Sequence, residues 1–283
     1  MEDIRAWRRS NDGTAGAGQA ADSPQSLLSA SPGGRSSAAG LSPTGGGLGP
    51  ERLTELFCQS QRLDFAERLE DGFRDLGIAP ADSSLGAQVA TVFASTSVVL
   101  VDRQEDGFLA EFVEKMAKKT SRANDVVTRV MVSSLLVSEA FGRSGYHAQN
   151  VQTRYERLVL ERADPSTGVI RLGDIMHDLA APGGSKGRQP GAGAARHRAL
   201  LFKAVADWLS IAPCSLCRDG EGASWNVVLI EGEPFVLDVM FDPGALYTES
   251  SGKANEYLRR LRQEGKDGTA STATSAGAAA GGG

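Results

Sequence analysis

The segment at residues 199–209 constrains the fold of this chain more than any other. Apart from Lys203 and Asp207, every side chain in it is apolar, and neither glycine nor proline interrupts it. A helix that is apolar nearly all round is buried on most of its sides. The pattern therefore predicts a central helix against which the other elements pack.

Three short apolar segments follow this predicted helix. Residues 213–217 have mild strand character, and residues 225–230 and 235–240 are rich in the β-branched and aromatic residues that favour strands. Residues 231–234 contain glycine and proline and are short enough for a hairpin connection. We therefore expect an α+β domain in which a buried helix packs on an antiparallel meander.

Additional N-terminal helices are expected where apolar residues recur at helical spacing. These segments are residues 51–58 after Pro50, residues 63–73, residues 107–119 capped by Asp106, and residues 126–141 capped by Asn124 or Asp125. Four apolar residues should form the buried face of the last of these helices: Val130, Leu135, Leu136 and Val137. Residues 97–101 are a short apolar strand candidate.

Both ends of the chain are rich in glycine, serine and alanine. Residues 1–50 and 266–283 cannot bury enough apolar surface to offset chain entropy, so we expect disordered tails around one domain at residues 51–265. Within that domain, the Gly- and Pro-rich residues 181–193 should form a flexible insertion before the central helix. Residues 252–262 should form a basic helix, whose face at Arg259, Arg260 and Arg262 is expected to be solvated or, alternatively, to bind an acidic partner.

Charge and composition exclude several classes of partner. The net charge of −5 over 283 residues does not favour nucleic acid or an anionic membrane. No apolar run reaches the ~20 residues that span a bilayer. Three cysteines do not make a disulfide framework in a chain of this length. We therefore expect a cytoplasmic or nuclear protein that binds neither nucleic acid nor membrane and has no transmembrane segment.

A combination of residues around the central helix resembles a known family. Its members are Arg196, His197 and Arg198 at the helix start, Trp225 and Asn226 on the second predicted strand, and the run LDVM at residues 237–240 on the third. The combination resembles the core of transglutaminase-like and papain-like cysteine enzymes. It is most similar to the peptidase-like domain found N-terminal in plant Raf-like kinases of the ethylene-response and disease-resistance groups, and in armadillo-repeat proteins. The resemblance implies a transglutaminase-like α+β core.

The same resemblance implies where a catalytic triad would lie. Such enzymes place a cysteine at the start of the central helix, a histidine on the second strand and a carboxylate on the third. Alignment puts Ala195, Ser224 and Asp238 at these positions. A methyl group cannot act as a nucleophile, and a serine hydroxyl cannot serve as the general base near neutral pH. The resemblance therefore implies a vestigial site without catalysis.

The residues around the helix start are expected to be structural. Asp238 would need a partner if it is buried, and Arg196, His197 and Arg198 are the candidates for a structural ion pair. A histidine in such a position is more often packed or capping than catalytic. We predict no cofactor and no metal site here.

Two cysteines leave a second hypothesis open. Cys214 and Cys217 form a Cys-x-x-Cys motif inside a predicted strand. Residues three apart on a strand point to opposite faces, so we expect one buried thiol and one exposed thiol. A single such motif is weak evidence for zinc. The alternative function is an active cysteine hydrolase or acyltransferase that uses Cys214 or Cys217.

The function implied by the resemblance is a non-catalytic regulatory or protein-interaction module in signalling. The chain has none of the glycine-rich, His-Arg-Asp or Asp-Phe-Gly motifs of a kinase catalytic domain. We expect either a stand-alone module or a fragment of a kinase or armadillo-repeat protein. Its partners would be proteins, such as a signalling kinase or a receptor complex.

Overall fold

The predicted central helix is present and is buried as its composition requires. In the computed structural model, helix α8 spans Ala195–Trp208, and every residue from His197 to Asp207 is buried. The structure describes residues 48–77, 98–142, 157–164, 166–176, 195–220 and 222–275, with side chains described as far as residue 263 in the last range. The predicted insertion at residues 181–193 and nearly all of the predicted tail at residues 1–50 lie outside these ranges.

The described elements follow one another in mixed order. They are α2 (Pro50–Ser60), β1 (Arg62–Leu63), β2 (Phe73–Asp75), β3 (Val98–Val101), α4 (Gly107–Thr120), α5 (Val126–Ala140), β4 (Val169–Arg171), α7 (Leu172–Met176), α8 (Ala195–Trp208), β5 (Cys214–Arg218), β6 (Ser224–Ile230), β7 (Glu233–Leu237), β8 (Leu246–Thr248) and α9 (Gly252–Ser275). Residues 157–162 are also helical. The α+β class predicted from the sequence is confirmed. No helix in these ranges is long and apolar enough to cross a membrane.

The strands form two sheets. The larger has five strands in the order β1-β5-β6-β7-β8, and each neighbouring pair is antiparallel. The smaller has three strands in the order β2-β3-β4, in which β4 runs parallel to β3. The predicted hairpin joins β6 to β7 through Glu231 and Gly232, whose φ angles of 53° and 84° suit a two-residue turn. The predicted meander is therefore confirmed and extended by one strand at each edge.

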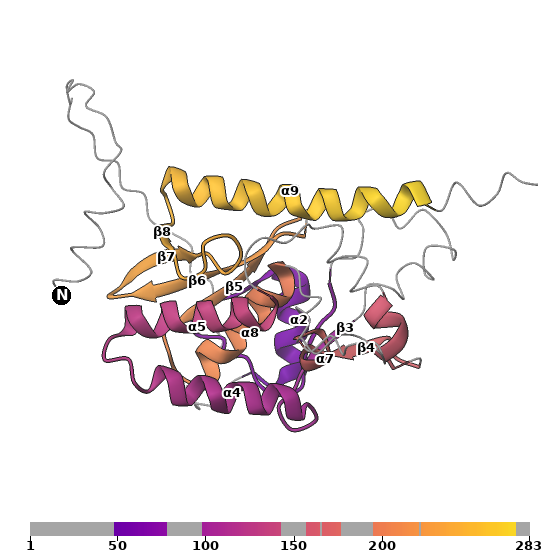
Figure 1. Ribbon diagram of the computed structural model, residues 1–283, viewed down its shortest axis with the longest axis horizontal. Helices are drawn as coiled ribbons and strands as arrows, with labels where there is room; N and C mark the ends of the chain where they lie inside the picture. Colours follow the sequence, from indigo (N-terminus) through magenta and orange to yellow (C-terminus); the bar gives the residue numbers. More distant parts are fainter. Residues whose placement is uncertain are drawn as a thin grey trace, which may run out of the picture. The chain divides into compact units, whose positions relative to one another are not determined.

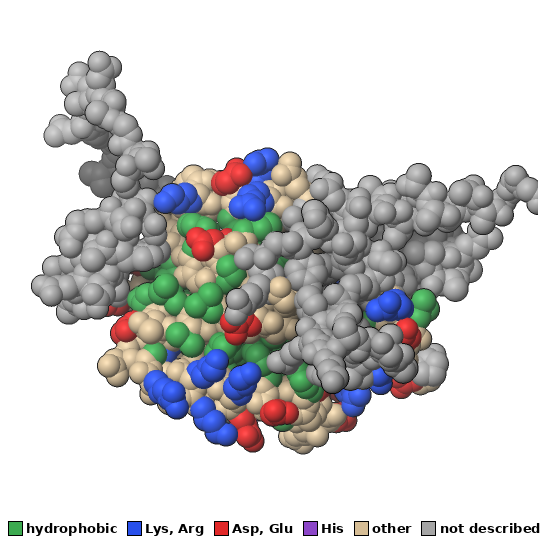
Figure 2. Space-filling model, viewed as in Figure 1, with side chains coloured by type: hydrophobic (Ala, Val, Ile, Leu, Met, Phe, Trp, Pro, Cys, Tyr) green, Lys and Arg blue, Asp and Glu red, His purple; other side chains and the backbone are tan. Residues whose placement is uncertain are grey.

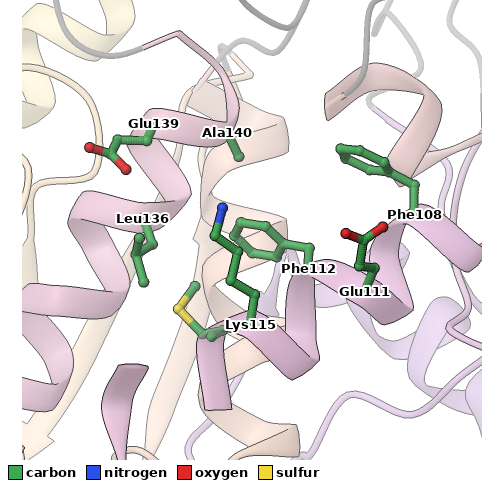
Figure 3. Close-up of a pocket in the computed structure, with 8 residues that line it drawn as sticks. Phe108, Glu111, Phe112, Lys115, Leu136, Glu139 and Ala140 are labelled. Carbon is green, nitrogen blue, oxygen red and sulfur yellow. The ribbon is translucent and has the colours of Figure 1, made fainter. Parts of the chain in front are cut away.

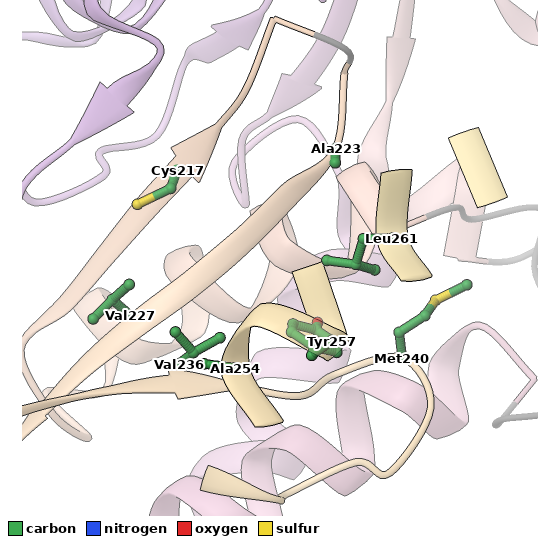
Figure 4. Packing of buried hydrophobic residues seen from close by; sticks show 8 residues of the cluster. All are labelled: Cys217, Ala223, Val227, Val236, Met240, Ala254, Tyr257 and Leu261. Carbon is green, nitrogen blue, oxygen red and sulfur yellow. The ribbon is translucent and has the colours of Figure 1, made fainter. Parts of the chain in front are cut away.

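Helices cover both faces of the larger sheet. Helix α8 contacts β5 and β6 on one face, and α5 packs against α8 (Figure 1). On the other face, Ala254, Tyr257 and Leu261 of α9 pack in an apolar cluster with Val227 and Val236 of the sheet (Figure 4). The central layer is thus buried on both sides.

The packing of α9 on the second face of the sheet corrects the prediction for the two cysteines. Cys214 shares the α8 face with Asn226, whose Nδ2 lies 3.6 Å from its Sγ, and Cys217 belongs to the α9 cluster. They point to opposite faces, as predicted. However, Cys214 is 0% and Cys217 only 5% exposed, so the expectation that one would be exposed is wrong. The reason is α9. Its Arg259 and Arg260 are exposed, as expected for a solvated basic face, but its apolar side covers the sheet face that carries Cys217.

The helix predicted at residues 63–73 is absent, and two buried charges explain why. Lys203 Nζ donates to the backbone oxygens of Glu67 at 2.7 Å and Cys214 at 2.6 Å. The Asp207 carboxylate accepts the backbone N–H of Leu69 at 2.7 Å. Backbone groups that α8 binds in this way cannot form an intrahelical ladder, so the segment crosses the molecule in turns between β1 and β2.

Two smaller predictions also differ from the structure. In α5, Val130, Leu136 and Val137 are buried as predicted, but Leu135 is 48% exposed. Helix α9 continues to Ser275, through residues assigned to a disordered tail. The caps of α4 and α5 are confirmed, since the side chains of Asp106 and Asp125 accept backbone N–H groups of the helices that follow them.

A close contact between α4 and α7 gives the first prediction. Asp106 caps α4 and also accepts the backbone N–H of Gly173 at 2.6 Å. A Cβ atom on Gly173 would lie 2.2 Å from an Asp106 carboxylate oxygen. Gly173→Ala should therefore lower the free energy of unfolding by about 1–3 kcal/mol, as overpacking does, measured by urea denaturation. Gly107→Ala is the control because a Cβ atom at that position would meet nothing within 4 Å. Equal midpoints for the two variants would contradict the prediction.

Candidate functional site

The three positions aligned with a catalytic triad lie in neighbouring segments. Ala195 is the first residue of α8, Ser224 is the first residue of β6, and Asp238 directly follows β7. Ala195 packs against the apolar cluster that contains Ala223 and Met240. The N-terminus of α8 therefore meets the ends of the two strands that carry the other positions.

A buried ionic cluster occupies this end of α8. Asp75, at the end of β2, is fully buried and accepts from two arginines. Arg196 of α8 donates to it through Nε at 2.6 Å, and Arg218 of β5 donates through Nη2 to both carboxylate oxygens at 2.7 Å. Arg218 Nε also donates to Ser224 Oγ at 3.2 Å. The hydroxyl at the position of the general base is thus held by a guanidinium.

The electrostatics of the cluster favour its charged form. Burial by itself would raise the pKa of the Asp75 carboxyl, but Arg196 and Arg218 outweigh it and hold that pKa well below its usual range. Arg218 also lies over the Phe57 ring at 4.6 Å. These residues come from β2, α8, β5 and α2, so the cluster connects both sheets to the central helix.

The other motif residues also connect α8 to its surroundings. Arg198 is fully buried and donates to Ser138 Oγ at 2.9 Å and to the backbone oxygen of Phe141 at 3.3 Å. Asn226 Nδ2 donates to the backbone oxygen of Ala199 at 3.0 Å. Trp225 points away from α8 and packs against the α9 cluster. These contacts join α8 to α5 through Arg198, α8 to β6 through Asn226, and β6 to the α9 cluster through Trp225.

His197 is held neutral. It is 2% exposed, and its pKa is lowered to about 3, first by burial and then by the charge of Arg196. A base with so low a pKa is protonated only in strong acid and cannot take a proton from a thiol near neutral pH.

Asp238 has partners that the sequence did not predict. Its carboxylate accepts the backbone N–H groups of Met240 at 2.7 Å and Phe241 at 2.8 Å, and Tyr247 Oη lies 3.5 Å away. The expected partners were Arg196, His197 or Arg198, but the ion pair of Arg196 is with Asp75. Burial raises the pKa of Asp238, and the backbone hydrogen bonds oppose this shift. The carboxylate therefore fixes the turn that leads from β7 to β8.

The cysteines of the alternative hypothesis lie in the middle layer of the fold. Burial raises the pKa of both the Cys214 and Cys217 thiols, whereas reactive cysteines have a lowered pKa and partial exposure. Within the described ranges, no group of three or more His, Cys, Asp or Glu side chains could hold a metal ion.

No sequence pattern singles out Asp75 and Arg218, the two residues that define this site. Asp75 lies just beyond a segment whose apolar spacing predicted a helix, and Arg218 directly follows a predicted strand. Each is an ordinary charged residue in the sequence. The two residues are 143 positions apart and are connected by a hydrogen bond that only the tertiary structure shows.

Comparison with known proteins gives partial similarity. The chain is 25% identical over 219 residues to the probable serine/threonine-protein kinase SIS8 of Arabidopsis thaliana, which covers 69% of this chain and 20% of the kinase. It is 40% identical over 74 residues to human armadillo repeat-containing protein 3, which covers 22% of this chain and 8% of that protein. The chain thus spans a fifth or less of these curated proteins. No protein-family model and no solved structure matches it.

The ionic cluster gives a prediction about stability. Asp75→Asn would leave two buried guanidinium groups without their counter-charge, so it should lower the free energy of unfolding by about 3–5 kcal/mol. The matched control is Glu256→Gln, which breaks the exposed pair with Arg259 and should not move the denaturation midpoint measurably. Adding Arg218→Met to Asp75→Asn should recover part of the loss, because one unpaired charge is removed. Additive losses in the double variant would contradict this account.

Because His197 is buried in its neutral form, we expect the free energy of unfolding to depend on pH. Because the unfolded state binds a proton near pH 6.5 and the folded state only near pH 3, the contribution is complete above pH 6.5 and is lost as the pH falls toward 3. Between pH 7 and pH 5 the wild type should lose about 2 kcal/mol more than His197→Gln. Urea titrations at both pH values measure this difference, and parallel losses in the two proteins would show that His197 is accessible to protons.

Proposed function

We propose that this chain is a non-catalytic, peptidase-like module that regulates or recruits signalling proteins. The observation that supports the proposal is the identity of the residues near the α8 N-terminus. Ala195 stands where a nucleophile would be, and the Ser224 hydroxyl accepts from Arg218 where a base would be. A thiolate and an imidazole are the two groups that such chemistry requires, and neither position supplies one.

The transglutaminase-like assignment of the core belongs to this proposal. Its support is the order of a buried helix α8 followed by the antiparallel strands β5, β6 and β7. Helix α8 packs directly on β5 and β6. In the enzymes that this order resembles, the reactive groups lie at the helix start and on the second and third strands after it. In this chain the corresponding positions, at the start of α8, at the start of β6 and directly after β7, hold Ala195, Ser224 and Asp238.

The signalling context rests on the similarity to part of a kinase. That similarity extends over most of this chain but only 20% of the kinase. We infer a role as a region that accompanies or controls other proteins, and not as the catalytic unit itself. The shorter similarity to an armadillo repeat-containing protein suits the same kind of role.

The alternative function, a cysteine hydrolase or acyltransferase, has less support. Cys214 and Cys217 are buried in β5, and burial raises the pKa of each thiol. A substrate would have to displace α8 or α9 to reach them. Cys58 is exposed on α2, outside the helix–strand arrangement that this chemistry uses.

Thiol labelling together with turnover assays tests the proposal. In the native protein, an alkylating reagent should label Cys58 rapidly, whereas Cys214 and Cys217 should react only after denaturation. Purified protein should show no amidase or acyl-transfer turnover. Cys58→Ser serves as the control, since it should abolish the rapid labelling. Turnover that disappears in Cys214→Ser or Cys217→Ser would refute the proposal and establish the alternative.

A gain-of-thiol variant tests the placement of the site in the same assay. Ala195→Cys, made in the Cys58→Ser background, should place a thiol at the start of α8 next to Arg196. The helix dipole and the guanidinium should lower its pKa below the ~8.5 of free cysteine. An ordinary thiol pKa in the folded variant would show that position 195 is not the counterpart of a nucleophile.

A further inference from the structure

Helix α5 presents apolar side chains to solvent. Met131 is 37% and Leu135 is 48% exposed, and they are four residues apart, so they lie on one face of the helix. Apolar side chains gather in the middle of the molecular face that contains α5, between the basic groups of α9 and α4 (Figure 2). Leu48, Leu76 and Leu160 are exposed as well, but Met131 and Leu135 are neighbours on one helix face, and adjoining exposed apolar side chains are a feature of contact surfaces.

A small cavity adjoins this face, between α4 and α5. Phe112, Met116 and Leu136 contribute apolar walls. The charged side chains of Glu111, Lys115 and Glu139 also line the cavity, and Lys115 extends between Phe112 and Leu136 (Figure 3). Its volume is about 100 Å³. A cavity that holds benzene is about 150 Å³, and ligand pockets start near 300 Å³. The cavity therefore fits a single inserted side chain and not a small-molecule ligand.

Charges on α4 follow a definite order beside this cavity. Glu111 and Glu114 come first, and Lys115 and Lys118 follow. Their spacing of three, four and seven residues places them on one face of the helix. The order also suits the helix dipole, so charge alone does not define an interface. The dipole of α4, however, does not explain why Met131 and Leu135 are exposed on the neighbouring helix α5.

We propose that the occupant of the α4–α5 face is a second copy of this chain, related by a two-fold axis. In an antiparallel α4–α4 contact, Glu111 would face Lys118 of the second copy and Glu114 would face its Lys115. The midpoint of both pairs lies between residues 114 and 115 of α4. A single two-fold axis through this point therefore relates the members of both pairs, and each pair occurs twice in the dimer. A two-fold interface must be self-complementary, and this order of charges is.

The same contact covers the apolar groups. Since Glu111 and Lys115 line the cavity together with residues of α5, the charged face of α4 adjoins α5. Docking two α4–α5 hairpins would bring Leu135 and Met131 out of water and allow one side chain to enter each cavity. In this arrangement the charge pairs lie around the two-fold axis, and Leu135 and Met131 of each α5 lie to one side of them. The proposal does not depend on whether the α8 site is catalytic.

Sedimentation equilibrium of the full chain, over about 1–100 µM, tests this dimer. The wild type should show a monomer–dimer equilibrium that weakens with added salt. Leu135→Ser should weaken dimerisation at least tenfold. Glu111→Lys alone and Lys118→Glu alone should each do the same, because each places like charges opposite one another twice. Glu55→Lys, on α2, is the control for net charge and should leave the dimer unchanged.

Two further samples test the geometry. The double variant Glu111→Lys/Lys118→Glu should dimerise as the wild type does, because its charges are reversed but still complementary. An equimolar mixture of the two single variants should form a mixed dimer, in which opposite charges again face one another. A wild-type far-UV circular dichroism spectrum and cooperative thermal unfolding confirm that each variant is folded, because melting temperatures themselves shift with dimerisation.

Three results would overturn the proposal. If the wild type stays monomeric at every concentration, the dimer does not form, and a helix of another protein becomes the candidate occupant of the α4–α5 face. If Leu135→Ser and both charge reversals leave the affinity of the dimer unchanged, the dimer forms through another surface. A dimer that the single variants weaken but the double variant does not restore lacks the antiparallel α4 contact. Sedimentation decides each case without reference to turnover, so failure here and failure of the proposed function are distinguishable.

Discussion

The structure depends on a buried carboxylate shared by two arginines. Asp75 comes from the smaller sheet, Arg218 from the larger sheet and Arg196 from the start of the central helix. Asp75 is fully buried and the side chain of Arg218 only 2% exposed, so neither charge is compatible with the interior without the other. The cluster therefore fixes the relative positions of both sheets and the helix at a single point.

This cluster also includes one of the positions of the candidate site, since Arg218 donates to Ser224. An enzyme of the resembled type needs mobile proton carriers at the helix start. Here Ser224 accepts from Arg218 of this cluster, and Asp238 accepts two backbone amides. Under our proposal, residues at the positions of catalytic groups connect elements of the fold. Such a site can stabilise a recognition module without chemistry of its own.

A second buried pair organises the opposite end of α8. Lys203 and Asp207 are 3.0 Å apart and nearly inaccessible, and between them they bind backbone groups of Glu67, Leu69 and Cys214. The long stem of a lysine allows its charge to reach carbonyl groups beyond the helix surface. In the sequence these two residues only interrupt an apolar run. In the structure they determine the course of the segment between β1 and β2.

The sequence by itself determined the elements whose signals are local. The apolar run at residues 199–209, the aspartate caps and the hairpin turn each depend on neighbours a few positions apart, and α8, α4, α5 and the β6–β7 hairpin form as predicted. Only the tertiary structure decided which faces are covered and which charges meet. Asp75 and Arg218 are 143 positions apart, α9 buries the face that carries Cys217, and Lys203 displaces the helix expected at residues 63–73. The physical reason is that a buried charge or an exposed strand face takes its partner from whatever the chain brings near it, and local periodicity does not encode that partner.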